Sequence, residues 1–100
     1  MAPIVEIKNS DDSDNFINGN SRAVIFFGSS GCGHCRSMKP IYDELARSYP
    51  NIAFAHVETN NVKTNDLEGV PAFVAYYNRQ PVDQVLGARE NALRAMIQRL

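Results

Sequence analysis

Apolar residues along this chain fall into short runs separated by polar stretches. The run Ala23–Phe27 lacks polar–apolar alternation, as expected for a central strand covered on both faces. Val70–Tyr77 is also strongly apolar. Strands are predicted over Ile4–Lys8, Ala23–Phe27, Ile52–Val57, Val70–Tyr77 and Val82–Leu86.

Helices are predicted between and after these strands. The polar run 9–14 offers N-cap residues and early carboxylates for a short helix through Phe16 and Ile17. From about Cys35 to Tyr49, apolar residues recur at spacings of three and four, which is typical of an amphipathic helix. The polar segment Asn60–Glu68 is expected to contain a short helical turn. The last helix is marked by Leu93, Met96, Ile97 and Leu100.

The order of these elements predicts the fold class. Strand, helix and strand over residues 23–57 form a βαβ unit, which requires parallel pairing. The last two strands are expected to be antiparallel, because only the turn Asn78–Pro81 joins them. We therefore expect one α/β domain over residues 1–100, with a mixed central sheet of about five strands and helices on both faces.

Composition then excludes several functions. Ten Lys and Arg against eleven Asp and Glu give a net charge of −1 without a basic cluster, so no nucleic-acid partner is expected. No apolar run reaches the roughly 18 residues that cross a bilayer, so no membrane partner is expected either. The first residues lack the basic lead of a secretory signal. Two cysteines are few for a secreted disulfide scaffold, so we expect a cytoplasmic protein. Nothing in the sequence demands more than a monomer, so a monomer is expected.

Both cysteines lie in the stretch GCGHC, at the junction between a predicted strand and helix. A C-x-x-C pair at this junction is typical of a redox dithiol. Cys32 is expected at the start of the helix, where free backbone N–H groups and the helix dipole favour a thiolate. Cys35, about one turn further, is placed to attack the Cys32 sulfur. Cys32 is therefore predicted as the nucleophile and Cys35 as the resolving cysteine.

Neighbouring residues are expected to modulate this pair. A protonated His34 favours the Cys32 thiolate and hence the reduced form, which makes the disulfide a stronger oxidant. Arg36 adds to the same field, and Gly33 completes the intervening pair. No metal site is predicted, because a structural zinc site requires four ligands and the chain has one C-x-x-C pair.

From about Val5 to Leu100 the chain resembles the thioredoxin family. The resemblance rests on the apolar strand before GCGHC, on the proline five residues after the second cysteine, on the segment GVPA at 69–72 and on Gly87 after the last strand. It implies a thioredoxin fold and a thiol–disulfide oxidoreductase that acts on disulfide-containing proteins without a bound cofactor. It also implies that an NADPH-dependent thioredoxin reductase resets the dithiol.

The resemblance further implies a substrate-binding surface. The Val70–Pro71 peptide bond would be cis, Pro71 would lie against the cysteine pair, and the Val70 backbone would pair with the substrate polypeptide. Substrate contacts are expected from Gly31, Val70, Pro71, Gly87 and Ala88. The intervening Gly-His resembles protein disulfide isomerase domains, whereas typical thioredoxins carry Gly-Pro.

Three positions depart from the family pattern. Gly31 stands where relatives usually carry Trp, and Phe26 stands where they usually bury Asp or Glu to take the proton of the second cysteine. His56 stands at the position of a Lys that often accompanies that acid. An aromatic ring cannot act as a base. We therefore expect water, together with His56, to take the proton of Cys35.

Three alternative functions remain open on the sequence. The Gly-His pair favours the same chemistry directed towards disulfide formation or isomerisation. The missing Trp and acid would fit a non-catalytic binding module. Carriage of a metal or iron–sulfur cluster would need a dimer to supply further thiolates.

Overall fold

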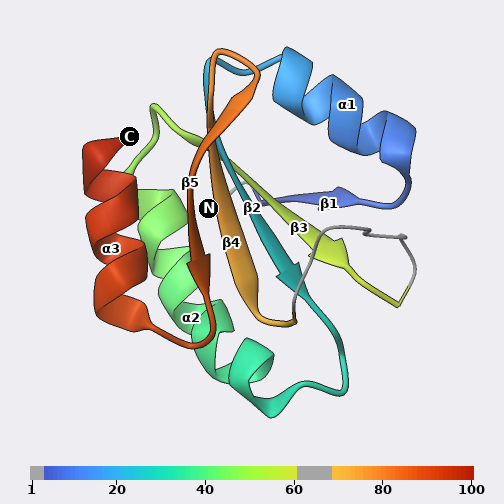
Figure 1. Ribbon diagram of the computed structural model, residues 1–100, viewed down its shortest axis with the longest axis vertical. Coiled ribbons are helices and arrows are strands. Elements are labelled where there is room, and N and C mark those ends of the chain that lie inside the picture. Colours follow the sequence, from blue (N-terminus) through green and yellow to red (C-terminus); the bar gives the residue numbers. More distant parts are fainter. Residues whose placement is uncertain (1–3, 61–68) are drawn as a thin grey trace.

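A five-stranded mixed sheet lies between helices in the computed structural model, which describes residues 4–60 and 69–100 (Figure 1). In chain order the elements are β1 Ile4–Ile7, α1 Ser10–Asn18, β2 Arg22–Gly28, α2 Gly33–Ser48, β3 Ala53–Glu58, β4 Ala72–Tyr77, β5 Gln80–Leu86 and α3 Glu90–Arg99. The strand order is β1-β3-β2-β4-β5. The first three strands pair in parallel, and β4 and β5 join antiparallel. The expected α/β architecture is confirmed.

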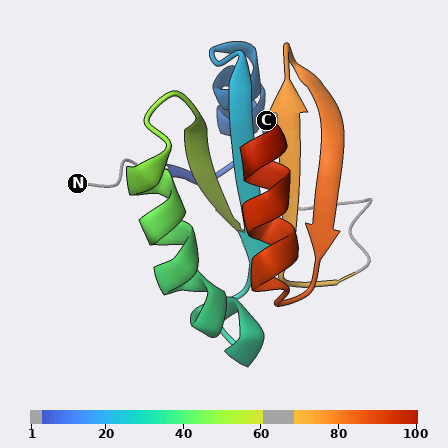
Figure 2. The same ribbon diagram turned by 90° about the vertical axis from the view of Figure 1, so that its left-hand side faces the viewer.

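Helices cover both faces of the sheet. Figures 1 and 2 show α2 and α3 on one side and α1 on the other. Successive residues of β2 serve both sides: Val24 and Phe26 pack into the core under α2 and α3, and Ala23 and Ile25 into the core under α1. This two-sided burial explains why the strand shows no polar–apolar alternation.

Local sequence signals set the helix starts. The side chain of Asn9 caps α1 by accepting a hydrogen bond from the Asp12 N–H at 2.8 Å, as the polar run predicted. Cys32 occupies the N-cap position of α2, so the first cysteine lies at the helix start as expected. Among the described residues, no helix is long and apolar enough to cross a membrane.

Several predicted boundaries differ from the structure by one or two residues. The fourth strand begins at Ala72 rather than Val70, and a cis peptide bond joins Val70 and Pro71 immediately before it. The predicted turn 78–81 is too long: Asn78 and Arg79, at φ 50° and 72°, alone make the turn, and β5 already begins at Gln80. Two central residues with positive φ match the twist of antiparallel strands. The helical turn expected within 60–68 falls on residues 61–68, outside the described residues.

Candidate active site

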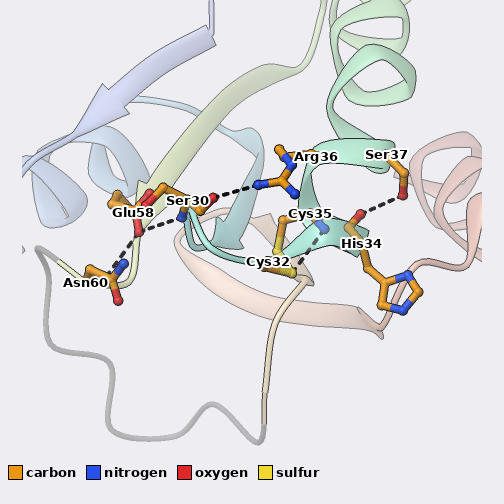
Figure 3. The surroundings of a disulfide bond; sticks show 8 residues. All are labelled: Ser30, Cys32, His34, Cys35, Arg36, Ser37, Glu58 and Asn60. Atoms are coloured by element: carbon orange, nitrogen blue, oxygen red, sulfur yellow. Dashed lines mark hydrogen bonds between the residues drawn. A yellow bond between two sulfur atoms is a disulfide. The ribbon is translucent and has the colours of Figure 1, made fainter.

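The two cysteines form a disulfide at the start of α2, with 5.2 Å between their Cα atoms (Figure 3). Cys32 is the last residue of the loop 29–32 that follows β2, and Cys35 lies in the first turn of the helix. The Cys32 Sγ accepts a hydrogen bond from the Cys35 backbone N–H, with 3.1 Å between N and Sγ. A donor at a helix start stabilises negative charge on sulfur, so the reduced form of this site favours a thiolate at Cys32.

The two sulfur-bearing residues differ in exposure. Cys32 is half-buried, whereas Cys35 is 5% exposed and belongs to the core under α2 and α3. A substrate disulfide can therefore reach Cys32 from solvent, while Cys35 can reach only its neighbour. The two cysteines are therefore not equivalent in access from solvent.

Gly28, at the end of β2, has no side chain and so leaves room for the buried side chain of Cys35. A Cβ on Gly28 would lie 3.3 Å from the Cys35 Sγ and 3.1 Å from the Phe26 ring. The sequence prediction missed Gly28, although a glycine that ends a buried strand is a signal for close approach of another group.

The residues predicted to modulate the pair lie around the first helical turn, but their side chains do not converge on the sulfurs. His34 is exposed, and Figure 3 shows its ring extending away from the disulfide. Its carbonyl accepts a hydrogen bond from the Ser37 Oγ at 2.8 Å. The Arg36 Nη1 donates to the Ser30 carbonyl at 3.1 Å, so the guanidinium points to the loop before Cys32. Gly33 is exposed at the first position of α2.

A second hydrogen bond reaches the same loop from the sheet. The Ser30 backbone N–H donates to the Glu58 Oε1 at 3.2 Å (Figure 3). Glu58 is the last residue of β3 and lies opposite Gly28 in the register of β2 and β3. The sequence prediction did not include Glu58 or Ser30, because nothing local in the sequence indicates which loop a strand end will face.

The predicted substrate-binding residues gather at the same end of the sheet. Antiparallel register places Ala72 beside Phe27 on one side and beside Leu86 on the other. The buried Pro71 accepts a hydrogen bond at its carbonyl from the Gly87 N–H at 2.7 Å. Val70 and Cys32 both pack against the core cluster that contains Cys35.

A shallow cleft of about 260 Å³ follows from this arrangement. Its lining residues are Gly69, Val70, Pro71, Leu86 and Gly87. Three of the predicted contacts are therefore brought together, whereas the exposed Gly31 and Ala88 are not part of the cleft. Leu86, 37% exposed, was missed by the sequence prediction, which treated it only as the end of a strand.

His56 lies beside the Phe26 ring and is paired with Glu6. Its Nδ1 is 2.9 Å from the Glu6 Oε2, and its ring centroid is 5.2 Å from that of Phe26. Phe26 stacks in turn on Phe73 at 4.7 Å. His56, Glu6 and Phe26 line a cavity of about 60 Å³, and neither cysteine lines it. The structure therefore does not bring His56 to Cys35.

Possible metal ligands do not converge in the part of the chain that is described. No group of three or more His, Cys, Asp or Glu residues is placed there to hold a metal ion.

This site combines three features: a cysteine pair that closes a disulfide at a helix start, a sheet with this strand order, and a cis proline immediately before β4. Together these features define the thiol–disulfide oxidoreductases. The family model for thioredoxin matches residues 4–99, and this chain belongs to the thioredoxin family. Its members are thiol–disulfide oxidoreductases, and the Cys32–Cys35 pair is the redox-active disulfide of this one.

Individual relatives agree over nearly the whole chain. Thioredoxin-3 of Dictyostelium discoideum is 28% identical over 102 residues, covering 98% of this chain and 97% of that protein. Mitochondrial thioredoxin 3 from Saccharomyces cerevisiae, in its oxidized form, superposes with a TM-score of 0.92 at 28% identity, covering 97% and 95% of the two chains. Thioredoxin from Fasciola hepatica also gives a TM-score of 0.92, at 27% identity and with 96% and 98% covered. The thioredoxin fold expected from the sequence is confirmed.

Proposed function

We propose that this protein reduces disulfides in other proteins, with Cys32 as nucleophile and Cys35 as resolving residue. The observation that carries the proposal is the unequal exposure of the two cysteines at a helix start that stabilises charge on Cys32. The thiolate is the attacking species in disulfide exchange. Cys32, the less buried cysteine and the one whose charge the helix start stabilises, is therefore the one that attacks.

Two exchange steps complete the reduction. The Cys32 thiolate attacks one substrate sulfur, the substrate S–S bond breaks, and the second substrate sulfur leaves and gains a proton. Cys35 then loses its proton and attacks the Cys32 Sγ, so that the first substrate sulfur also leaves as a thiol. Two electrons pass to the substrate, and the Cys32–Cys35 disulfide remains. An external reductant must reset it, and we propose an NADPH-dependent thioredoxin reductase for that step.

The substrate is proposed to bind along the cleft of about 260 Å³ at this end of the sheet. Val70, Pro71 and Gly87 line that cleft, and Leu86 adds an exposed apolar side chain. We propose that the Val70 backbone pairs with an extended substrate polypeptide there, as the family resemblance implies. We include Gly31 and Ala88 as outer contacts, since both are exposed.

For the proton of Cys35 we propose water, assisted by His56. A cavity of about 60 Å³ beside the Phe26 ring has room for water, and His56 and Glu6 supply polar partners there. Because His56 does not contact Cys35, its assistance would pass through water. The Gly-His pair between the cysteines, in the first turn of α2, keeps disulfide formation or isomerisation as the second candidate.

We also propose that the protein acts as a cytoplasmic monomer and that residues 1–100 form a single domain. The low cysteine count supports the compartment.

The test compares Cys32→Ser and Cys35→Ser with the wild-type protein in reduction of insulin disulfides, with NADPH and thioredoxin reductase as electron source. Cys32→Ser is expected to lose all turnover, because no thiolate remains to attack. Cys35→Ser is expected to accumulate a mixed disulfide with the substrate, detectable by non-reducing electrophoresis and mass spectrometry. Partner binding and cellular function that survive intact in Cys32→Ser would instead identify a binding module.

A further inference from the structure

The backbone of Ser30 is held from two sides by side chains of opposite charge. Its N–H donates to the Glu58 carboxylate at 3.2 Å, and its carbonyl accepts from the Arg36 guanidinium at 3.1 Å (Figure 3). Ser30 lies two residues before the nucleophilic cysteine. These two hydrogen bonds, named here the Glu58–Ser30–Arg36 bridge, therefore restrain the loop that sets the position of Cys32.

Both ends of this bridge are fixed to regular structure. Glu58 ends β3, and the Thr59 N–H immediately after it donates to the Gly28 carbonyl at 2.9 Å. The Glu58 Oε1 also accepts from the Asn60 N–H at 3.3 Å. At the other end, the Arg36 backbone N–H donates to the Cys32 carbonyl at 3.2 Å within the first turn of α2. The bridge thus joins the end of the sheet to the start of the helix across the loop.

Among the residues that the structure describes, the loop 29–32 has few other restraints. Ser30 and Gly31 are exposed, and a Cβ placed on Gly31 would meet no atom within 4 Å among the described residues. Glycine loses more conformational freedom on ordering than any other residue, so a path through Gly31 needs support from its neighbours. One such support is a turn in which the Cys32 N–H donates to the Ser29 carbonyl at 3.1 Å. The bridge at Ser30 is the other.

We propose that Glu58 and Arg36 are positioning residues for the nucleophile, acting through the backbone of Ser30. Hydrogen bonds that involve a charged group are about twice as strong as neutral ones, which suits them to holding an exposed loop. They present Cys32 in the orientation that an incoming protein disulfide requires. This inference rests on the proposed role of Cys32 as the attacking residue.

The test measures the second-order rate at which reduced wild-type protein, Glu58→Ala, Glu58→Gln and Arg36→Met attack a protein disulfide. Rates are taken on the high-pH plateau of the rate profile, where Cys32 is fully ionised and differences in thiolate fraction vanish. We expect Glu58→Ala and Arg36→Met to react about tenfold more slowly, because misplacement of a reacting group is costly. Glu58→Gln keeps an oxygen that accepts from the Ser30 N–H, and it is expected to recover most of the rate.

Two further measurements separate positioning from general damage. Alkylation of the Cys32 thiolate by iodoacetamide on the same plateau is expected to match wild type in every variant, because a small reagent needs no docked geometry. Glu44→Ala is the matched control: it removes an exposed carboxylate 2.7 Å from Arg94, between α2 and α3, and should leave the rate unchanged.

The possible outcomes are distinct. A wild-type rate in Glu58→Ala, or a Glu58→Gln variant as slow as Glu58→Ala, would overturn the positioning role. Arg36→Met leaves β3 untouched and decides the question if Glu58→Ala does not fold. A wild-type protein that fails to attack the disulfide at all would refute the proposed function itself.

Discussion

Phe26 is the single residue that changes the chemistry of this site most. Its ring is buried between those of Phe73, Tyr42 and His56, at centroid distances of 4.7, 5.1 and 5.2 Å. Relatives that bury a carboxyl at this position would have an acceptor for the proton of the resolving cysteine. Here an aromatic stack contributes to the core instead, and we propose that the proton leaves by water.

A substitution at His56 tests how that proton leaves. We expect His56→Ala to slow the attack of Cys35 on a mixed disulfide several-fold and to alter the pH profile of that step. The effect should fall well short of the roughly 100-fold or more that a direct general base supplies, since His56 does not contact Cys35. Rapid-quench measurement of release from a glutathione mixed disulfide at Cys32 would show this.

Glu6→Gln is the companion variant, because it keeps the imidazole but removes its carboxylate partner. If His56→Ala leaves both the rate and its pH profile unchanged, water alone is sufficient and His56 has only a local structural role.

At the level of elements, α2 connects the chemistry to the sheet. Its first turn holds the cysteines. About two turns after Cys35, the buried Tyr42 hydroxyl lies 3.1 Å from the Val24 carbonyl and 2.7 Å from the Ala55 carbonyl. These contacts fix the helix over β2 and β3. Burial raises the pKa of Tyr42 well above its usual range, despite the opposing hydrogen bond to the Ala55 carbonyl.

Tyr42→Phe should therefore have a pH-dependent effect on stability. At neutral pH we expect a loss of about 1 kcal/mol, the usual net value of one hydrogen bond. The raised pKa contributes stability below pH ~10 that is lost at higher pH, because the unfolded tyrosine ionises there and the folded one does not. The wild-type protein should thus lose stability more steeply above pH ~10 than the Phe variant. Denaturant unfolding at pH 7 and across pH 9.5–11 checks both parts.

The contribution of Tyr76 must be separated in that comparison. Burial also raises its pKa, so part of the alkaline loss remains in Tyr42→Phe. Equal slopes for the two proteins would contradict the assignment of the effect to Tyr42.

For the whole molecule, sequence patterns predicted the order and type of the helices and strands better than their first and last residues. Runs such as Ala23–Phe27 and the three–four spacing along α2 report burial directly, because burial decides which residues those positions tolerate. The position of Cys32 at a helix start followed from the same patterns. The two-residue turn at Asn78 and Arg79 did not, because backbone conformation at polar residues depends on the twist of the strands that they join.

Contacts between distant segments were the part that the sequence could not supply. The bond from Ser30 to Glu58 spans 28 positions, and the pair His56–Glu6 spans 50. Both depend on the parallel register of β3 with its neighbours, which no local pattern specifies. The cleft residue Leu86 was missed for the same reason, since it faces the cis proline segment only after β4 and β5 pair.

The reduction potential of the Cys32–Cys35 couple tests the central claim most directly. The protein would be equilibrated with glutathione buffers of known ratio, and its free thiols trapped and counted. We predict a single cooperative two-electron transition near about −270 mV, the range of dithiol reductants. A transition near about −180 mV would contradict the reducing direction and favour disulfide formation or isomerisation. The absence of any cooperative transition would contradict a catalytic dithiol altogether.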